Sequence, residues 1–190
     1  MRLFFCITIG VMKKILYICL GLIVVVGVYG AMSGSSSIST DKQSFDPRNT
    51  TYVIDGFDVT LVDGVSSVSV IPDSASKIVT RYFGNESIGD LDGDGRDDTS
   101  YLITQDRGGS GTFYYVVVAL NKEDGYEVTN VFFVGDRIFP QSTNINTSAR
   151  ELYVNYVERR SGEPMTAQPS QGATLYLKVT SDGVLEGLMK

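Results

Sequence analysis

The sequence predicts an all-β protein, an antiparallel meander that packs as a sandwich or open barrel, after one N-terminal transmembrane helix. Residues 15–32 form an unbroken apolar run of 18 residues directly after Lys13 and Lys14. From residue 50 onward, short β-branched and aromatic runs alternate with Asp-Gly and other turn signals, which is the pattern of short strands joined by turns. No window after the apolar run keeps a helical period over three turns.

The apolar run sets the expected compartment. As a helix, 18 residues span about 27 Å, close to the thickness of the hydrocarbon core. Lys13 and Lys14 are expected to stay in the cytoplasm, so that the rest of the chain lies outside. The length favours an uncleaved anchor, because the apolar part of a signal peptide usually has about 7–15 residues. The alternative is a cleaved signal segment with its site near Val28-Tyr29-Gly30.

We therefore expect three parts in the chain. Residues 1–32 are the membrane anchor or signal segment, and residues 33–49 are a Ser-rich flexible spacer. Residues 50–190 are the β domain, which is expected in the periplasm or at the cell surface on a single-pass protein of the cytoplasmic membrane. Its predicted strands cover residues 51–54, 57–62, 65–71, 77–83, 99–104, 113–120, 126–134, 151–158, 174–179 and 184–188.

Turn residues separate these strands in order. Asp55-Gly56 and Asp63-Gly64 predict two tight hairpins among the first three strands, because Asp-Gly suits the positive φ of such turns. Residues 121–125 read Asn-Lys-Glu-Asp-Gly and predict a third hairpin, and Ser181-Asp182-Gly183 predicts the last one. The eleven Tyr and nine Phe residues fit the half-buried faces of a pleated sheet.

Composition excludes several classes of chemistry. The chain has no His, and both cysteines, Cys6 and Cys19, lie in the N-terminal segment. The β domain therefore lacks Ser-His-Asp or Cys-His catalysis, zinc bound by His or Cys, and an internal disulfide. The net charge is −6, and it becomes −9 without the first 31 residues, which hold three of the 16 basic residues and no acid. This charge argues against a nucleic-acid partner, and we expect no enzyme.

One segment carries a pattern for metal binding, and we name residues 90–98 the Asp loop. Carboxylates at its first, third, fifth and ninth positions can point at one centre, and the seventh position can offer its carbonyl oxygen. Hard oxygen ligands in this number suit Ca²⁺ better than Mg²⁺. An EF-hand is excluded because it requires Glu at the twelfth position, and the twelfth residue counted from Asp90 is Tyr101. The alternative is an acidic surface turn without metal. The expected ligands are Asp90, Asp92, Asp94, the carbonyl of Arg96, and Asp98.

The stretch from Phe83-Gly84 through Gly89-Asp90 to Asp98, continuing into residues 99–104, resembles an FG-GAP repeat. This repeat is the calcium-loop unit of integrin-type β-propellers, and the chain holds one copy of it. The resemblance implies the same five calcium ligands in the Asp loop. It covers residues 83–104 and leaves the rest of the domain undefined.

Three further segments extend the resemblance to a family of uncharacterised bacterial exported proteins with an N-terminal membrane segment. They are residues 81–86, residues 109–115 and residues 162–166. Some members of that family continue into a META-type domain. The resemblance implies an exported β domain and brings no activity with it.

Three functions follow as expectations. The leading one is a membrane-anchored, extracytoplasmic, calcium-binding β module with a binding or structural role in the cell envelope. The second is an inhibitor or sensor subunit that docks a partner protein through an exposed β edge. The third and weakest is a hydrolase that uses the metal to activate water.

Residues 107–111 are either an anion-binding nest or, as their composition favours, a flexible connection. Residues 159–164 are either a basic contact patch or a solvated turn.

Overall fold

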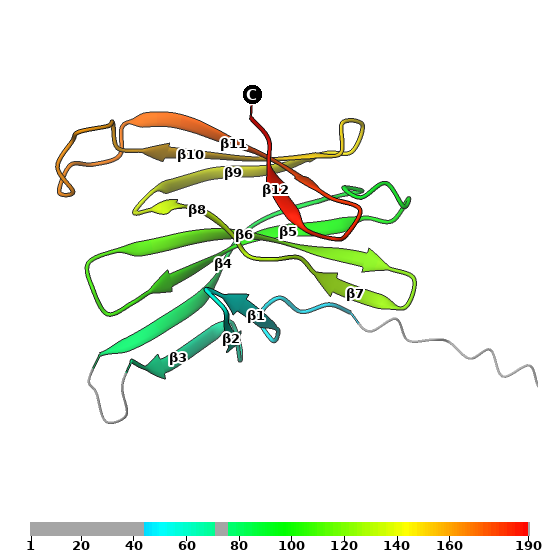
Figure 1. The fold of residues 1–190 in the computed structure, drawn as a ribbon, viewed down its shortest axis with the longest axis horizontal. Coiled ribbons are helices and arrows are strands. Elements are labelled where there is room, and N and C mark those ends of the chain that lie inside the picture. Colours follow the sequence, from blue (N-terminus) through cyan, green and yellow to red (C-terminus); the bar gives the residue numbers. More distant parts are fainter. Residues whose placement is uncertain (1–43, 71–75, 190) are drawn as a thin grey trace, which may run out of the picture. The chain divides into compact units, whose positions relative to one another are not determined.

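The computed structural model describes residues 44–70 and 76–189, and in this part of the chain it contains β-strands and no helix (Figure 1). The all-β prediction is therefore confirmed. Among the described residues, no helix has the length and apolar character needed to cross a membrane. The predicted anchor, residues 1–32, and residues 33–43 of the predicted spacer lie outside the described residues.

Every strand pairing in the described part is antiparallel, as predicted. The strands are β1 (Thr51–Ile54), β2 (Phe57–Thr60), β3 (Val65–Ser69), β4 (Lys77–Gly89), β5 (Asp98–Asp106), β6 (Thr112–Lys122), β7 (Gly125–Val128), β8 (Phe132–Asp136), β9 (Phe139–Asn146), β10 (Glu151–Glu158), β11 (Gln171–Val179) and β12 (Leu185–Gly187).

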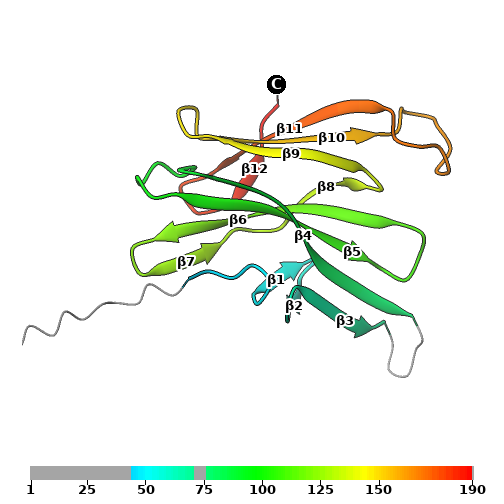
Figure 2. The same cartoon turned by 180° about the vertical axis from the view of Figure 1, so that it is seen from behind.

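The strands form three sheets. The central sheet has six strands, in the order β3-β4-β5-β6-β7, with β8 also pairing with β6. A second sheet has the order β12-β11-β10-β9, and β1 and β2 form a separate hairpin. Figures 1 and 2 show the β9–β12 sheet on one side of the central sheet and the β1–β2 hairpin on the other.

Strands β5 and β6 are buried on both faces, because successive side chains of a strand point to opposite faces. Leu102, Val116 and Val118 belong to one core, which they form with residues of the β9–β12 sheet such as Leu152 and Leu177. Tyr101, Ile103, Tyr115, Val117 and Ala119 belong to a second core on the opposite face. This two-sided burial explains why β6 reads as a continuous apolar run from Phe113 to Leu120 and why β5 is apolar from Tyr101 to Ile103.

The second core is rich in tyrosine. The Tyr52 hydroxyl donates to the Pro47 carbonyl at 2.6 Å and lies 3.1 Å from the Tyr101 hydroxyl. Burial raises the pKa of Tyr52 to about 12 and raises that of Tyr101 as well. Phe45 packs against this core, and the Arg48 guanidinium lies 5.2 Å from the centre of the Tyr82 ring. Residues before position 50 therefore take part in the packed structure.

Several strands differ in extent from the predicted ones; β4, for example, continues to Gly89 instead of ending at residue 83. Two differences change the number of strands. Strand β9 was not predicted, because Pro140 and several polar residues hide its pattern. A register shift in the pairing with β10 accommodates this proline, which pairs with Tyr156. The predicted strand 126–134 is two strands, β7 and β8, which both pair with β6. The chain turns between them at Asn130, whose side chain bonds to the backbone N–H and C=O of Leu185 at 2.6 and 3.2 Å.

Candidate metal centre

The Asp loop connects β4 to β5. Because the two strands are antiparallel neighbours, Gly89 at the end of β4 pairs with Asp98 at the start of β5. The first and last carboxylates of the loop, Asp90 and Asp98, therefore start from adjacent positions at one end of the sheet. The chain between them closes a tight loop over this end.

Asp98 fastens the loop to the sheet. Its side chain is fully buried, with an exposed fraction of 0%. One carboxylate oxygen accepts the Leu91 N–H at 2.8 Å and the other accepts the Asn121 N–H at 2.9 Å. Burial raises the pKa of Asp98, and the bonds from the Asn121 and Leu91 N–H groups oppose that shift. The residue thus joins the loop to the end of β6.

Asp90 organises the turn inside the loop. Its two carboxylate oxygens accept the N–H groups of Gly93 at 2.6 Å and of Gly95 at 3.0 Å. Both glycines have a φ of +84°, in the left-handed region where other residues are strained. The alternation of Asp and Gly therefore allows the backbone to wrap around a carboxylate.

Asp92 completes a cluster of three acids. One of its oxygens accepts the Asp94 N–H at 3.1 Å, and the other accepts a hydrogen bond from Lys122 Nζ. This bond to Asp92 raises the pKa of Lys122. One oxygen from each of Asp90, Asp92 and Asp98 lies within 4.8 Å of the others, so the three residues could hold a metal ion.

The structure does not bring Asp94 into this cluster. The Asp94 carboxylate pairs with the Arg96 guanidinium at 2.7 Å and accepts the Arg96 N–H at 2.9 Å. The bond from the Arg96 N–H is the main cause of the lowered pKa of Asp94. The Arg96 side chain continues to the Asn121 carbonyl, to which Nε donates at 2.8 Å. Three of the four predicted side-chain ligands thus converge, and the fourth forms an ion pair beside them.

The donor set fits a hard divalent cation. Carboxylate oxygens suit Ca²⁺ and Mg²⁺ rather than softer metals. An oxygen that accepts one N–H bond keeps a lone pair with which it can bind a metal. The remaining ligands of a Ca²⁺ ion, which takes six to eight oxygens, would be water or backbone carbonyl groups.

Sequence reasoning missed two basic residues beside the loop. Lys122 comes from the end of β6, 30 residues after its partner Asp92. Arg150 comes from the turn between β9 and β10, and its guanidinium lies against Gly93. A Cβ atom added to Gly93 would be only 2.1 Å from Arg150 Cζ. No spacing in the sequence signals either contact, because both depend on how the strands are arranged.

The other segments considered from the sequence have structural contacts. Arg107 donates to the Tyr115 hydroxyl at 2.7 Å, pairs with Asp55 and lies over the Phe113 ring. The Gly108 N–H bonds to the Asp106 carboxylate at 2.9 Å, so this amide of the predicted nest is already used. The turn at 159–164 is closed by bonds between residues 160 and 163.

Comparison with known proteins finds no family model, no curated protein and no solved structure that matches this chain. The resemblance to FG-GAP repeats and to exported bacterial proteins therefore stays a prediction.

Proposed function

We propose that the protein is a calcium-binding β module, anchored in the cytoplasmic membrane with its folded domain outside, that has a binding or structural role in the cell envelope. The observation that carries this proposal is the convergence of Asp90, Asp92 and Asp98 within 4.8 Å. The N-terminal apolar run supports the anchor, and the negative charge of the remaining chain suits cation binding.

Electrostatics favours an ion at this cluster. Three carboxylates at such short range repel one another, and Lys122 is the cation that bonds directly to one of them. A Ca²⁺ ion would add two positive charges at their centre. Calcium sites in extracellular modules have Kd values of about 10⁻⁴–10⁻³ M, which suits a site with few protein ligands.

The test is thermal unfolding of the full-length chain in neutral detergent, with calcium or with EDTA. Free calcium at about ten times Kd contributes roughly 1.4 kcal/mol. This should raise the Tm by about 3–6 °C for a domain of this size. Asp92→Asn should abolish the shift, whereas Asp97→Asn should keep it, because Asp97 lies outside the cluster. Equal Tm values in calcium and in EDTA for the unmodified chain would disprove the proposal.

A substitution at Asp94 tests whether this residue is a calcium ligand in addition to Asp90, Asp92 and Asp98. Because Asp94 pairs with Arg96, it must leave this partner before it can bind the ion. We therefore expect Asp94→Asn to weaken calcium binding less than Asp92→Asn does. Calorimetry of both variants measures the difference, and an equal loss would place Asp94 among the ligands.

Membrane anchoring has an independent test. A reporter fused after Lys190 should be active only outside the cytoplasm, and the protein should stay with membranes after a salt wash. The reason is the apolar run that follows Lys13 and Lys14. Recovery of a soluble form that begins at Ala31 would show cleavage instead.

A role as a docking subunit is the second candidate, and the edge of the central sheet favours it. Strand β3 is the end strand of that sheet, and Val65 and Val68 on it are 44% and 58% exposed. An extended segment of a partner could add to this edge through main-chain hydrogen bonds. Val68→Lys should then abolish recovery of a membrane partner by the protein, without lowering its Tm.

A further inference from the structure

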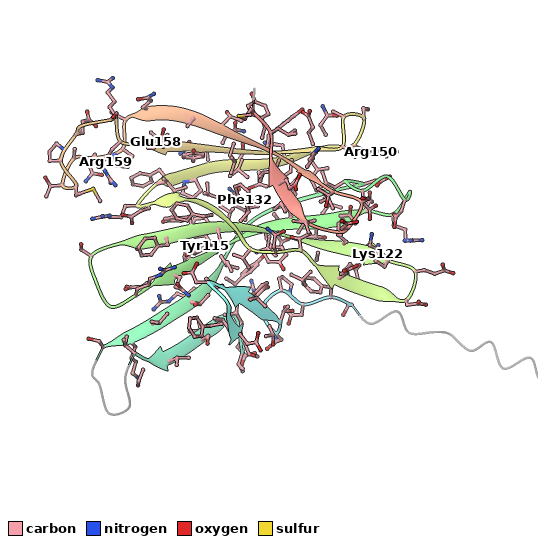
Figure 3. All side chains as sticks on the ribbon, viewed as in Figure 1. Tyr115, Lys122, Phe132, Arg150, Glu158 and Arg159 are labelled. Carbon is pink, nitrogen blue, oxygen red and sulfur yellow. The ribbon has the colours of Figure 1, made fainter. Side chains whose placement is uncertain are left out.

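A cleft of about 790 Å³ opens beside the Asp loop. Its walls come from the Asp loop, the β6–β7 hairpin, the β9–β10 turn and the β11–β12 turn. Its volume lies within the range of about 300–1,000 Å³ that is usual for small-molecule sites. Figure 3 shows Lys122 and Arg150, two residues of the cleft wall, at the same end of the molecule.

Arg150 is placed on this wall in an unusual way. Its φ of 53° lies in the left-handed region, which a residue other than glycine rarely adopts. The guanidinium group lies against Gly93, where a Cβ atom would clash with it. Within the described part of the chain, Arg150 forms no ion pair. Its planar group of N–H donors matches the oxygens of a carboxylate or phosphate group.

Lys122 is a second cation at the same place. It bonds to Asp92, the residue directly before Gly93, so Lys122 and Arg150 both contact the same two-residue segment of the Asp loop. Both residues line the cleft. An anion at this point of the wall can therefore be reached by two positive side chains.

A calcium ion would make this end of the cleft less negative by two charges. Asp90, Asp92 and Asp98 outnumber Lys122 and Arg150, and the cleft lining adds four more acids, Asp94, Glu127, Glu151 and Asp182, against one further base, Lys178. Without the ion, this surplus of negative charge opposes an anion. The ion would also compete with Lys122 for the Asp92 oxygens and leave the ammonium group available to a ligand.

We propose that this cleft binds a small organic oxyanion, a phosphate or carboxylate group held by Arg150 and Lys122, and that it does so only when calcium occupies the Asp loop. This inference rests on the proposed calcium site. The other acids of the lining, Asp94, Glu127, Glu151 and Asp182, repel an anion, so its oxygens must lie at the guanidinium and ammonium groups themselves.

The test is calorimetry on the full-length chain in neutral detergent. Calcium is titrated first and alone, which tests the proposed function by itself. Glycerol 1-phosphate, glycerate and glycerol are then titrated into the calcium-loaded chain and into the chain in EDTA. We expect at least one of the two anions to bind with calcium, at least about tenfold more weakly in EDTA, and neutral glycerol not to bind. The two anions distinguish a phosphate site from a carboxylate site.

Two further measurements assign the anion to the cleft. Arg150→Gln should weaken anion binding about tenfold or more, since a charged hydrogen bond is lost. Calcium binding in the absence of anion should not become weaker. Arg160→Gln removes the same charge from the β10–β11 connection and should change neither affinity. Because coupling between two ligands is reciprocal, the anion should strengthen calcium binding by the factor by which calcium strengthens anion binding.

Each other outcome contradicts a specific part of the argument. If calcium binds but neither anion does, or if an anion binds equally well in EDTA, the inference is overturned and the calcium site stands. Unchanged anion affinity in Arg150→Gln overturns it in the same way. If Arg150→Gln does not fold, Lys122→Met replaces it, with the same expected loss of anion binding. If calcium itself does not bind, the proposed function and this inference both fail.

Discussion

The two loops at opposite ends of β5 use charged side chains in opposite ways. The Asp loop joins β4 to β5, and residues 107–111 join β5 to β6. Both segments are rich in glycine. The sequence predicts a metal site in the Asp loop, whereas for residues 107–111 it favours a flexible connection over an anion-binding nest. In the first loop the carboxylates turn inward and accept backbone N–H groups. In the second, the Arg107 side chain extends away from the loop to Asp55 and Tyr115.

The difference shows what makes a loop a candidate site. In the Asp loop, the groups that hold the backbone are the same carboxylates that lie within 4.8 Å of one another. In the 107–111 loop, the Arg107 guanidinium packs on the Phe113 ring, 4.6 Å from its centre. This contact fixes the loop to the rest of the domain. Of these two loops, only the Asp loop brings several carboxylates together, which is the arrangement that could hold a cation.

The largest effect is expected from Asp98→Asn. An amide can accept only one of the two backbone N–H bonds that the carboxylate accepts, and its NH₂ group would face the other N–H. A buried donor without an acceptor should lower the free energy of unfolding by about 2–3 kcal/mol. Urea unfolding in EDTA measures it. The control is Asp97→Asn, because Asp97 is the neighbouring residue and its side chain is exposed. It should change the free energy of unfolding by less than about 0.5 kcal/mol. Similar values for both variants would contradict the role of Asp98.

Arg107→Ala tests the other loop and should have a smaller effect. The ion pair between Arg107 and Asp55 is exposed and contributes little to the free energy of unfolding. The bond to the Tyr115 hydroxyl and the contact with the Phe113 ring should account for a loss of about 1–2 kcal/mol. Urea unfolding measures it, with Arg160→Ala as the exposed control. A Tm shift with calcium should survive in Arg107→Ala, and its disappearance would contradict the separation of the two loops.

Alanine at single glycines separates backbone conformation from crowding. Gly95→Ala should cost about 1 kcal/mol, because its φ is +84° while no other atom is near its Cβ position. Gly93→Ala should cost only slightly more, because its Cβ would meet the guanidinium end of Arg150, a flexible side chain that can move aside. Adding Arg150→Ala should therefore change the cost of Gly93→Ala by less than about 0.5 kcal/mol. In the other loop, Gly109→Ala should be neutral, since its Cβ position is empty and its φ is not positive. A much lower melting temperature for the Gly93 variant than for the Gly95 variant would contradict this freedom of the Arg150 side chain.

The smallest effect concerns pH. NMR titration of the carboxyl carbons should show Asp98 titrating above the ordinary value of 3.8 and Asp94 below it. Asp94 therefore stabilises the fold above pH 3.8, and this contribution is lost as the pH falls through its lowered pKa. Asp98 acts oppositely: the folded state gains stability as the pH falls from its raised pKa towards 3.8. The two contributions act in different pH ranges, Asp98 above pH 3.8 and Asp94 below it, so their combined contribution to stability should pass through a maximum near pH 3.8. Titration of Asp98 below Asp94 would contradict the assigned environments.

Local sequence was sufficient for features that depend on neighbouring residues. Strands β1 and β10 have the predicted limits, because short alternating runs end at clear turn residues such as Asp55-Gly56. Three of the four predicted carboxylates of the Asp loop converge, because alternating Asp and Gly bring side chain and backbone together within a few residues. Asp94 differs because Arg96, two residues away, offers it an ion pair that the ligand pattern alone does not reveal.

The sequence by itself determined the all-β class, the antiparallel meander and the acidic loop, because hydrophobic period and turn chemistry act over a few residues. Only the tertiary structure decided that Lys122 and Arg150 border that loop, since these residues reach it from the end of β6 and from the β9–β10 turn. It also decided that β9 is a strand, because its polar sequence is held by pairing with β10 and by a bond from the Ile145 N–H to Ser87 Oγ at 2.9 Å. Contacts of this kind join distant parts of the chain, and their energy is set by the packing of whole sheets rather than by local preference.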